Sequence, residues 1–306
     1  MKCAKTYYLI CIVALQSVFS FAQQTKDSFL KPSDTIINSR KTTLLVGATA
    51  FTSGAFFVLN KLYYKNLTRS DFQFKDDNAE WLQMDKAGLL FTAYQITNSG
   101  ATALQWSGMG KKKQLVYSAA FALSFAAATE IIDGYSTNVG ASWGDFAASA
   151  CGTGLYVSQA LLWNEQRIVP KFSFHATPYA GAQPNVLGAS YVEQVFKDYN
   201  GQTYWLSANV KSFFKKSTIP AWLNVAFGYG ADGIITPNEA LVNTIFLPEK
   251  QRTRQFYLSF DVYLTKIPTK NRTLKTLLSI FNSIKIPAPT IEINGRGETK
   301  FRLFYF

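Results

Sequence analysis

Residues 255–265 read QFYLSFDVYLT, and this stretch decides the fold of the second half of the chain. Its side chains alternate in polarity: Phe256, Leu258 and Phe260 share one face, while Ser259 and Asp261 lie on the other. Alternation with a period of two is typical of a half-buried β-strand. The stretch therefore predicts a strand.

The same alternation recurs in five more stretches beyond Val169-Pro170, namely 172–176, 204–214, 223–229, 291–293 and 301–305. Asn294-Gly295 is a turn signal between the last two. We therefore expect about six antiparallel strands, as a curved sheet packed against helices or as part of a β-barrel. A full barrel from this half alone is not favoured, because bacterial barrels have at least ~8 strands.

One stretch in this half has a helical period. It carries apolar residues at helical spacing, flanked by basic residues, and comprises Leu274, Leu277, Leu278 and Phe281 with Lys270, Arg272, Lys275 and Lys285. Such a helix either packs on the sheet or lies on a lipid surface with its basic side outward.

The first half of the chain contains longer apolar segments, at 44–62, 87–106, 115–132 and 146–163. They are too long for strands, and small residues such as Ala148 and Gly152 allow helices to approach closely. The sequence thus predicts an α+β protein. An apolar bundle of about four helices occupies residues 43–168, and an antiparallel β-sheet or partial β-barrel with one amphipathic helix occupies 169–306.

Residues 1–22 have the pattern of a cleavable signal peptide: Lys2 and Lys5, then an apolar run, then Ser20 and Ala22 at the cleavage site. A polar segment, 23–42, follows. Cys3 and Cys11 come too early to be the lipid-bearing cysteine of a lipoprotein. After cleavage one cysteine, Cys151, remains, and its apolar neighbours predict a buried side chain.

Two locations in the envelope fit this pattern. The helices can be inner-membrane spans, but polar residues such as Gln95 and Asn98 interrupt them, and 111–113 would place three lysines outside, against the positive-inside preference. The final stretch, FRLFYF, resembles the terminal strand of outer-membrane proteins and favours the outer membrane or its periplasmic face.

The formal net charge of the 306-residue chain is +12. Export and the scattered distribution of basic residues argue against a nucleic-acid partner. Membrane lipid or lipopolysaccharide is the better electrostatic partner, and an envelope protein is a further possibility.

Four carboxylates lie near expected helix ends: Asp85, Glu130, Asp133 and Asp145. If the bundle brings these ends together, they form an acidic cluster that can bind a divalent cation such as Ca²⁺ through oxygen ligands. Glu130, Asp133 and Asp145 are also the candidate catalytic acid and base groups. Structural roles compete, because Ser142-x-x-Asp145 is close to a capping box and Asp85 suits a helix N-terminus.

These residues carry a family resemblance. Asp85-Lys86 with Tyr94, then Glu130-x-x-Asp133-Gly134, Ser142-Trp143-Gly144-Asp145 and Gly152, resemble the motif of the YfiM-like predicted periplasmic lipoproteins, a domain of unknown function. Later motifs, around Trp163–Arg167, Phe174–Tyr179 and Asp198–Gln202, resemble its longer Bacteroidota-type members. The helical half is loosely similar to VanZ-like proteins. The resemblance implies an envelope location and brings no established activity.

The chain departs from the family pattern at one position, where Leu89 replaces the usual His. Histidine is the commonest proton shuttle near neutral pH, so a histidine-dependent chemistry of the family would be lost here. The single histidine, His175, lies on the polar side of an expected strand, where an ordinary surface or lumen role is favoured.

The sequence supports three functional hypotheses. The first is a non-enzymatic structural or interaction protein at the outer membrane. The second is a membrane-associated enzyme that acts on lipid or cell-wall precursors through the acidic cluster. The third is a small transporter, for which Gln95, Asn98 and Glu130 would have to line a polar pathway.

Overall fold

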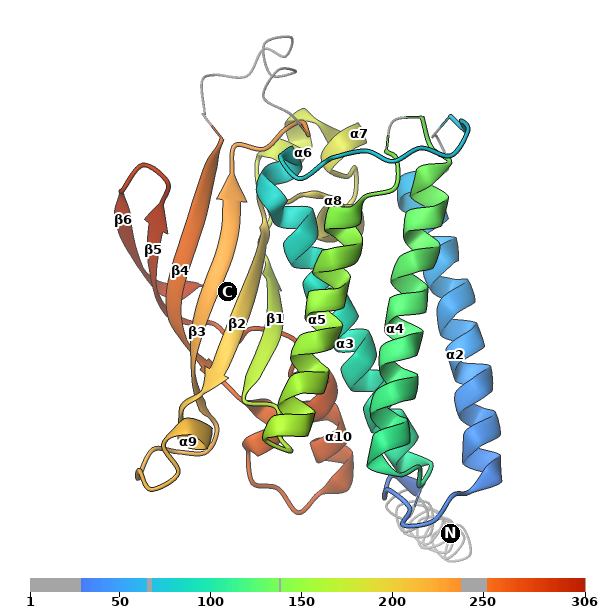
Figure 1. The fold of residues 1–306 in the computed structure, drawn as a ribbon. Coiled ribbons are helices and arrows are strands. Elements are labelled where there is room, and N and C mark those ends of the chain that lie inside the picture. The colour runs from blue at the N-terminus through green and yellow to red at the C-terminus, as the bar shows by residue number, and fades with distance from the viewer. Residues whose placement is uncertain (1–28, 65–67, 138, 238–251, 306) are drawn as a thin grey trace, which may run out of the picture.

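The computed structural model describes residues 29–64, 68–137, 139–237 and 252–305. The expected signal peptide and the terminal Phe306 lie outside these ranges. Four long helices run up and down side by side and form the bundle (Figure 1): α2 (Asn38–Leu59), α3 (Met84–Trp106), α4 (Lys111–Gly134) and α5 (Trp143–Leu162). Each contains one of the four predicted apolar segments, apart from a few terminal residues.

Six strands follow and form one antiparallel sheet in sequence order: β1 (Ile168–Phe174), β2 (Gln202–Asn209), β3 (Leu223–Asp232), β4 (Thr253–Val262), β5 (Ala288–Asn294) and β6 (Thr299–Tyr305). The sheet is open, because β1 and β6 are its edges. The predicted α+β class is confirmed, with a helical first half and a six-stranded sheet in the second.

Short helices and single turns occur in the connections between the long helices and strands. They are α6 (Tyr179–Ala182), α7 (Pro184–Leu187), α8 (Tyr191–Lys197) and α9 (Val210–Phe213), with the single turns η1 (Asn60–Tyr64), η2 (Glu80–Gln83) and η4 (Leu264–Lys266). The strand expected over 204–214 therefore ends early. Its last residue, Asn209, caps α9 by accepting a 3.1 Å hydrogen bond from the Ser212 backbone, which turns the chain away from the sheet.

A buried ion pair lies on the inner face of the sheet. Lys171 Nζ of β1 is 2.7 Å from Asp261 Oδ2 of β4, and both side chains have no solvent exposure. The Ser207 hydroxyl donates to the same carboxylate oxygen, and the Ile286 backbone N–H donates to the other at 3.1 Å. A buried pair of charges is tolerated when its remaining hydrogen-bonding capacity is satisfied in this way.

The rest of the inner face combines further hydrogen-bonded polar groups with a buried cluster of Trp205, Ala226, Tyr257 and Tyr305. Asn224 links Ser207 to Asn209, and Thr290 donates to Ser259. The sheet curls over this face, because the Tyr305 hydroxyl of β6 reaches Thr203 of β2 at 3.1 Å and Tyr257 of β4 at 2.9 Å. The sheet thus encloses its polar side.

The outer face of the sheet is apolar. Helix α3 covers its first strands, where Phe91 packs against Phe172 and Tyr204. Beyond α3 the outward side chains are exposed: Leu206, Phe227, Phe256, Leu258, Phe260, Ile291 and Ile293. The period of two therefore separates an inside that holds the polar groups from an apolar outside, whereas a water-soluble sheet has its polar face outward.

The bundle is tightly packed where α3 meets α5, whereas the side chains of α2 are largely exposed. Helices α3 and α5 touch at Gly152, where an added Cβ would lie 2.1 Å from the Leu90 carbonyl oxygen. Helix α2 has no buried residue and exposes Leu45, Val46, Phe51, Phe57 and Val58. Among the described residues, the helical segments Asn38–Tyr64 and Lys111–Gly134 are long and apolar enough to cross a membrane.

One expectation from the sequence is corrected, and the exposure of the amphipathic helix bears on the two alternatives that the sequence left open for it. Cys151 is exposed rather than buried, because it lies on the outward side of α5. The amphipathic helix is present as α10 (Arg272–Phe281), but it does not bury its apolar side in the protein. Leu274, Leu277, Ile280 and Phe281 are each between 45% and 63% exposed.

Candidate functional site

Lys86 is the centre of an ionic cluster at the end of the bundle where α3 and α5 begin and α4 ends, hereafter the acidic end. Its ammonium lies 2.7 Å from Asp77, 2.8 Å from Asp85 and 2.7 Å from Asp145. Lys86 itself is 13% exposed. One amine thus joins the 68–83 loop, α3 and α5.

Ser142 connects a second set of groups to this cluster. As the residue that caps α5, it accepts a 3.3 Å hydrogen bond from the Asp145 backbone, as the capping-box pattern predicts. Its hydroxyl donates to Asp77 at 2.6 Å. The reciprocal part of the box comes from another helix, because the Ser142 backbone N–H donates to Glu130 of α4 at 2.7 Å. Glu130 thereby ties α4 to α5.

The predicted carboxylates are therefore brought to one end of the bundle with different partners. Asp85 and Asp145 share Lys86, whereas Glu130 binds backbone and Asp133 is hydrogen-bonded by Tyr64 at the end of η1. Backbone N–H groups of Ser136 and Gly140 donate to the Asp133 carbonyl. Asp133 thus orders the α4–α5 turn.

Burial and the Lys86 ammonium have opposite effects on the pKa values of the carboxylates in this cluster. Burial raises the pKa of Asp145 to about 6, although Lys86 acts to lower it. For Asp77 the balance is reversed, since hydrogen bonds from Lys86 and Ser142 outweigh burial and hold its pKa below the ordinary value. The three carboxylates raise the pKa of Lys86, against the effect of burial. The amine is therefore charged at neutral pH.

The geometry fits an ammonium better than a metal ion. Ligand oxygens of Asp77, Asp85 and Asp145 lie within 4.8 Å of one another, which is the spacing of a cation site. The Lys86 amine already makes close contact with all three. A divalent cation would have to displace it, and Glu130 and Asp133 are not part of this group.

The other motif residues act in packing. The Tyr94 hydroxyl donates to Gln166 at 3.0 Å where the bundle meets the sheet, beside Val169 and Tyr263 and away from the cluster. Gly134 lies under the ring of Phe72, which would be 2.3 Å from an added Cβ. Gly152 allows the contact between α3 and α5. The motif thus describes how the 68–83 loop and three helices fit together.

His175 lies apart from the acidic cluster. It lines a pocket of about 250 Å³ at the mouth of the curled sheet with, among others, Tyr179, Asp232 and Tyr257. Burial, followed by the charge of Arg302, lowers the pKa of His175, so the ring is neutral at pH 7. Leu89 is partly buried on α3.

Two features of the site were missed from the sequence. Asp77 was not selected, although the acidic run Asp76-Asp77 shortly before the start of α3 was available as a signal. Gln95 was considered for a polar pathway, but its amide donates to the Pro170 carbonyl at 2.8 Å and joins α3 to β1.

The fold and site define an α+β protein whose helical end is fastened by a buried ionic cluster. Residues 73–161, which include the whole cluster, form a domain of the predicted periplasmic lipoprotein family DUF2279. This domain extends from the 68–83 loop to the end of α5. The description of the family, predicted periplasmic lipoprotein, suggests export to the cell envelope, and the function of the family is unknown. Comparison with curated proteins and with solved structures found no match.

Removal of the ammonium tests the structural role of the cluster. We expect Lys86→Gln to lower the free energy of unfolding by roughly 3 kcal/mol, because three largely but not fully buried carboxylates lose their shared partner. The measurement is urea unfolding in detergent micelles. Lys75→Gln is the matched control, since its ion pair with Glu80 involves a lysine that is 40% exposed and contributes less than about 1 kcal/mol. Equal effects of the two variants would contradict this role.

Proposed function

We propose that this protein is a non-enzymatic component of the cell envelope, embedded in a membrane and serving a structural or interaction role. The observation that carries the proposal is a belt of exposed apolar side chains around the molecule, hereafter the apolar belt. It comprises the exposed residues of α2, the outer face of the sheet, and Phe301, Leu303 and Phe304 of β6.

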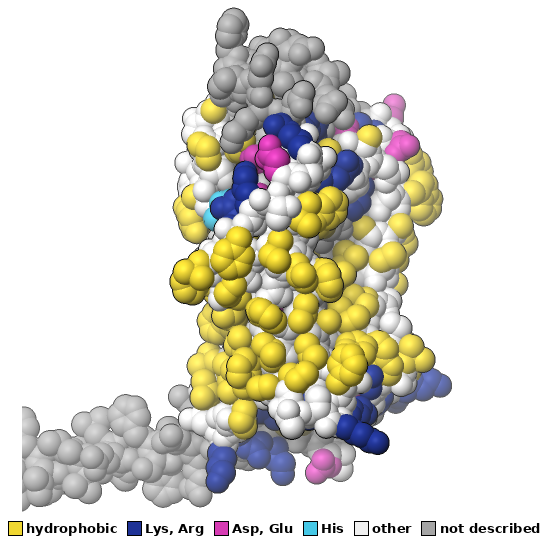
Figure 2. Space-filling model, turned by 90° about the vertical axis from the view of Figure 1, so that its left-hand side faces the viewer, with side chains coloured by type: hydrophobic (Ala, Val, Ile, Leu, Met, Phe, Trp, Pro, Cys, Tyr) yellow, Lys and Arg dark blue, Asp and Glu magenta, His cyan; other side chains and the backbone are white. Residues whose placement is uncertain are grey.

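The distribution of the belt favours lipid over a protein partner. Helix α2 lies on one side of the molecule and the apolar face of the sheet on the opposite side (Figure 1). Figure 2 shows the sheet side, where apolar side chains form a broad band with Lys and Arg at both its upper and its lower end. A single partner covers one side, whereas lipid surrounds both. The 24 residues of α4 span about 36 Å, enough for a hydrocarbon core of about 30 Å.

Aromatic side chains occur at both ends of the belt. At the acidic end, Trp143 is 71% exposed and stacks on Phe74 with ring centroids 5.4 Å apart. At the opposite end Phe214 and Trp222 are exposed. Aromatic residues are typical of the two interfaces of a membrane. The exposed apolar side of α10, flanked by basic residues, suits the same interface.

The outer membrane is the location that the sheet favours. Apolar outward and polar inward residues alternate along its strands, as they do in outer-membrane proteins. The six strands form an open sheet and not a closed barrel. The helices would therefore supply the rest of the surface that faces the lipid. Membrane lipid or lipopolysaccharide would contact the belt, and the charged ends are available to an envelope protein.

An enzyme acting on lipid or cell-wall precursors is the alternative, and the site supports it less well. A general acid or base has to reach a substrate with a free carboxyl group. Asp77, Asp85 and Asp145 are all engaged by Lys86, and Glu130 is engaged by the Ser142 backbone. Stabilisation of the bundle accounts for these contacts without a reaction.

Cell fractionation tests the proposal. We expect the protein to stay with the outer-membrane fraction and to resist extraction with alkaline carbonate, because lipid covers the apolar belt. Recovery with the inner membrane would contradict the outer-membrane location alone. Release into the soluble periplasmic fraction would contradict the embedding itself.

A charged residue introduced into the apolar belt shows whether the belt is in contact with lipid or with water. We expect Phe227→Arg to destabilise the protein in phospholipid bilayers by about 2–4 kcal/mol, the cost of an arginine on the lipid face of a membrane sheet. In water the same change at a residue that is 60% exposed would cost less than about 0.5 kcal/mol. The measurement is urea unfolding in bilayers.

The matched control is Val186→Arg in α7, which is also exposed but lies beyond the belt at the acidic end. It should leave the free energy of unfolding nearly unchanged. If Phe227→Arg is tolerated as well as Val186→Arg, the outer face of the sheet is in contact with water.

A further inference from the structure

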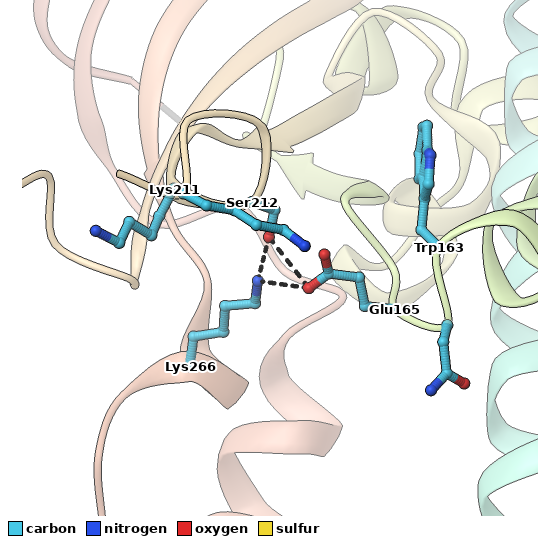
Figure 3. Close-up of a pocket in the computed structure, with 7 residues that line it drawn as sticks. Trp163, Glu165, Lys211, Ser212 and Lys266 are labelled. Atoms are coloured by element: carbon cyan, nitrogen blue, oxygen red, sulfur yellow. Dashed lines mark hydrogen bonds and ion pairs between the residues drawn. The ribbon is translucent and has the colours of Figure 1, made fainter. Parts of the chain in front are cut away.

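A basic pocket lies at the end of the molecule opposite the acidic end. It measures about 380 Å³ and is formed by three segments that are distant in sequence (Figure 3). Trp163 to Glu165 follow α5, Lys211 to Lys215 belong to and follow α9, and Lys266 ends η4. Lys111 at the start of α4 donates to Asn164 at 2.7 Å, which fixes the bundle against this rim.

Positive charge is in excess in the pocket. Three lysines, Lys211, Lys215 and Lys266, face one carboxylate, Glu165. Glu165 is 3.5 Å from Lys266 and 2.9 Å from Arg167, and these cations outweigh partial burial and hold its pKa below the usual value. Glu165 is therefore ionised and offsets Lys266. The Lys211 amine donates to the neutral Ser217 carbonyl, which leaves its charge unbalanced, so the charges of Lys211 and Lys215 remain for an anion.

The pocket is built rather than a chance group of surface lysines. Lys266 donates to Asn209 at 2.9 Å and also to the Ser212 hydroxyl, and both acceptors are buried. The Arg167 guanidinium lies over the Trp163 ring, 4.6 Å from its centroid. These contacts hold one wall of the pocket, while Lys215 is exposed at its rim.

Apolar side chains surround this basic pocket. Leu161 and Leu162 end α5, Phe213 and Phe214 lie beside Lys211 and Lys215, and all four are exposed. The lysines match the phosphate of a lipid at a membrane surface, and the exposed leucine and phenylalanine side chains beside them match its acyl chains. In a bilayer the acyl chains of such a lipid would contact the apolar residues, and its phosphate would contact the amines.

We propose that this pocket binds the phosphate of an anionic membrane-lipid headgroup. Lys211 and Lys215 supply the charge, and the Asn164 side-chain amide, whose oxygen accepts from Lys111, is the neutral group that can donate a hydrogen bond to the headgroup. The assignment rests on the proposed membrane embedding, and it adds a specific lipid contact at the basic end.

Bilayer nanodiscs test the assignment. The full mature chain is placed in phosphatidylcholine nanodiscs with a small fraction of phosphatidylglycerol, and native mass spectrometry measures which lipid it retains after release. We expect wild type to retain phosphatidylglycerol preferentially. Lys211→Gln/Lys215→Gln should weaken this retention by about tenfold. Lys266 is left in place because it holds the wall of the pocket.

The control variant removes the same charge from the same end. Lys270→Gln/Lys275→Gln alters two exposed lysines beside and on α10 and should keep the preference. Equal loss in both variants would overturn the pocket assignment in favour of diffuse attraction, and so would full retention by the pocket variant. Binding of millimolar inorganic phosphate by the pocket, without any preference for phosphatidylglycerol, identifies a free-phosphate site and overturns the lipid assignment.

The failure of the embedding is visible in the same experiment. Protein that stays outside the nanodiscs contradicts both the embedding and the lipid site. Protein that enters them without any preference for phosphatidylglycerol contradicts the pocket assignment only. Matching thermal unfolding of the two double variants excludes a folding defect as the cause.

Discussion

The buried ion pair between Lys171 and Asp261 is the constraint on which the arrangement of the sheet depends. Two charges without solvent exposure require that their neighbours supply hydrogen bonds, which Ser207 and the Ile286 backbone do. The polar side chains of the strands must therefore point inward. Because side chains alternate along a strand, the apolar ones point outward and form part of the apolar belt. The proposed lipid environment follows from this inverted polarity.

The two ends of the molecule differ in the kind of charge they carry. At the acidic end, Lys86 is surrounded by carboxylates and the charges are satisfied within the protein. At the other end, Lys211 and Lys215 are not offset in the same way, and exposed apolar residues adjoin them. We interpret the first end as a structural fastening of the DUF2279 domain and the second as a membrane-facing surface.

Much of the fold could be predicted from the sequence. The change of period near Val169 located the boundary between helices and sheet, and Asn294-Gly295 located the last hairpin. Alternation shows that the two faces of β4 differ but not which is inside, since that depends on a partner 90 residues away, Lys171. The Ser142 cap was local and was predicted. Its link to Glu130 and the place of Asp77 at Lys86 arise from packing between distant segments, so the sequence pattern did not reveal them.

Labelling of Cys151 tests the central claim most directly, because this exposed thiol lies in the middle of α5. The mature protein is placed in liposomes opened by freezing and thawing, and a charged maleimide is added before and after unfolding in detergent. An Asp71→Cys/Cys151→Ala variant, with its thiol in the exposed 68–83 loop, is the control. Embedding predicts that Cys151 reacts only after unfolding, while position 71 reacts at once. Equal labelling of both positions in the intact bilayer would contradict it.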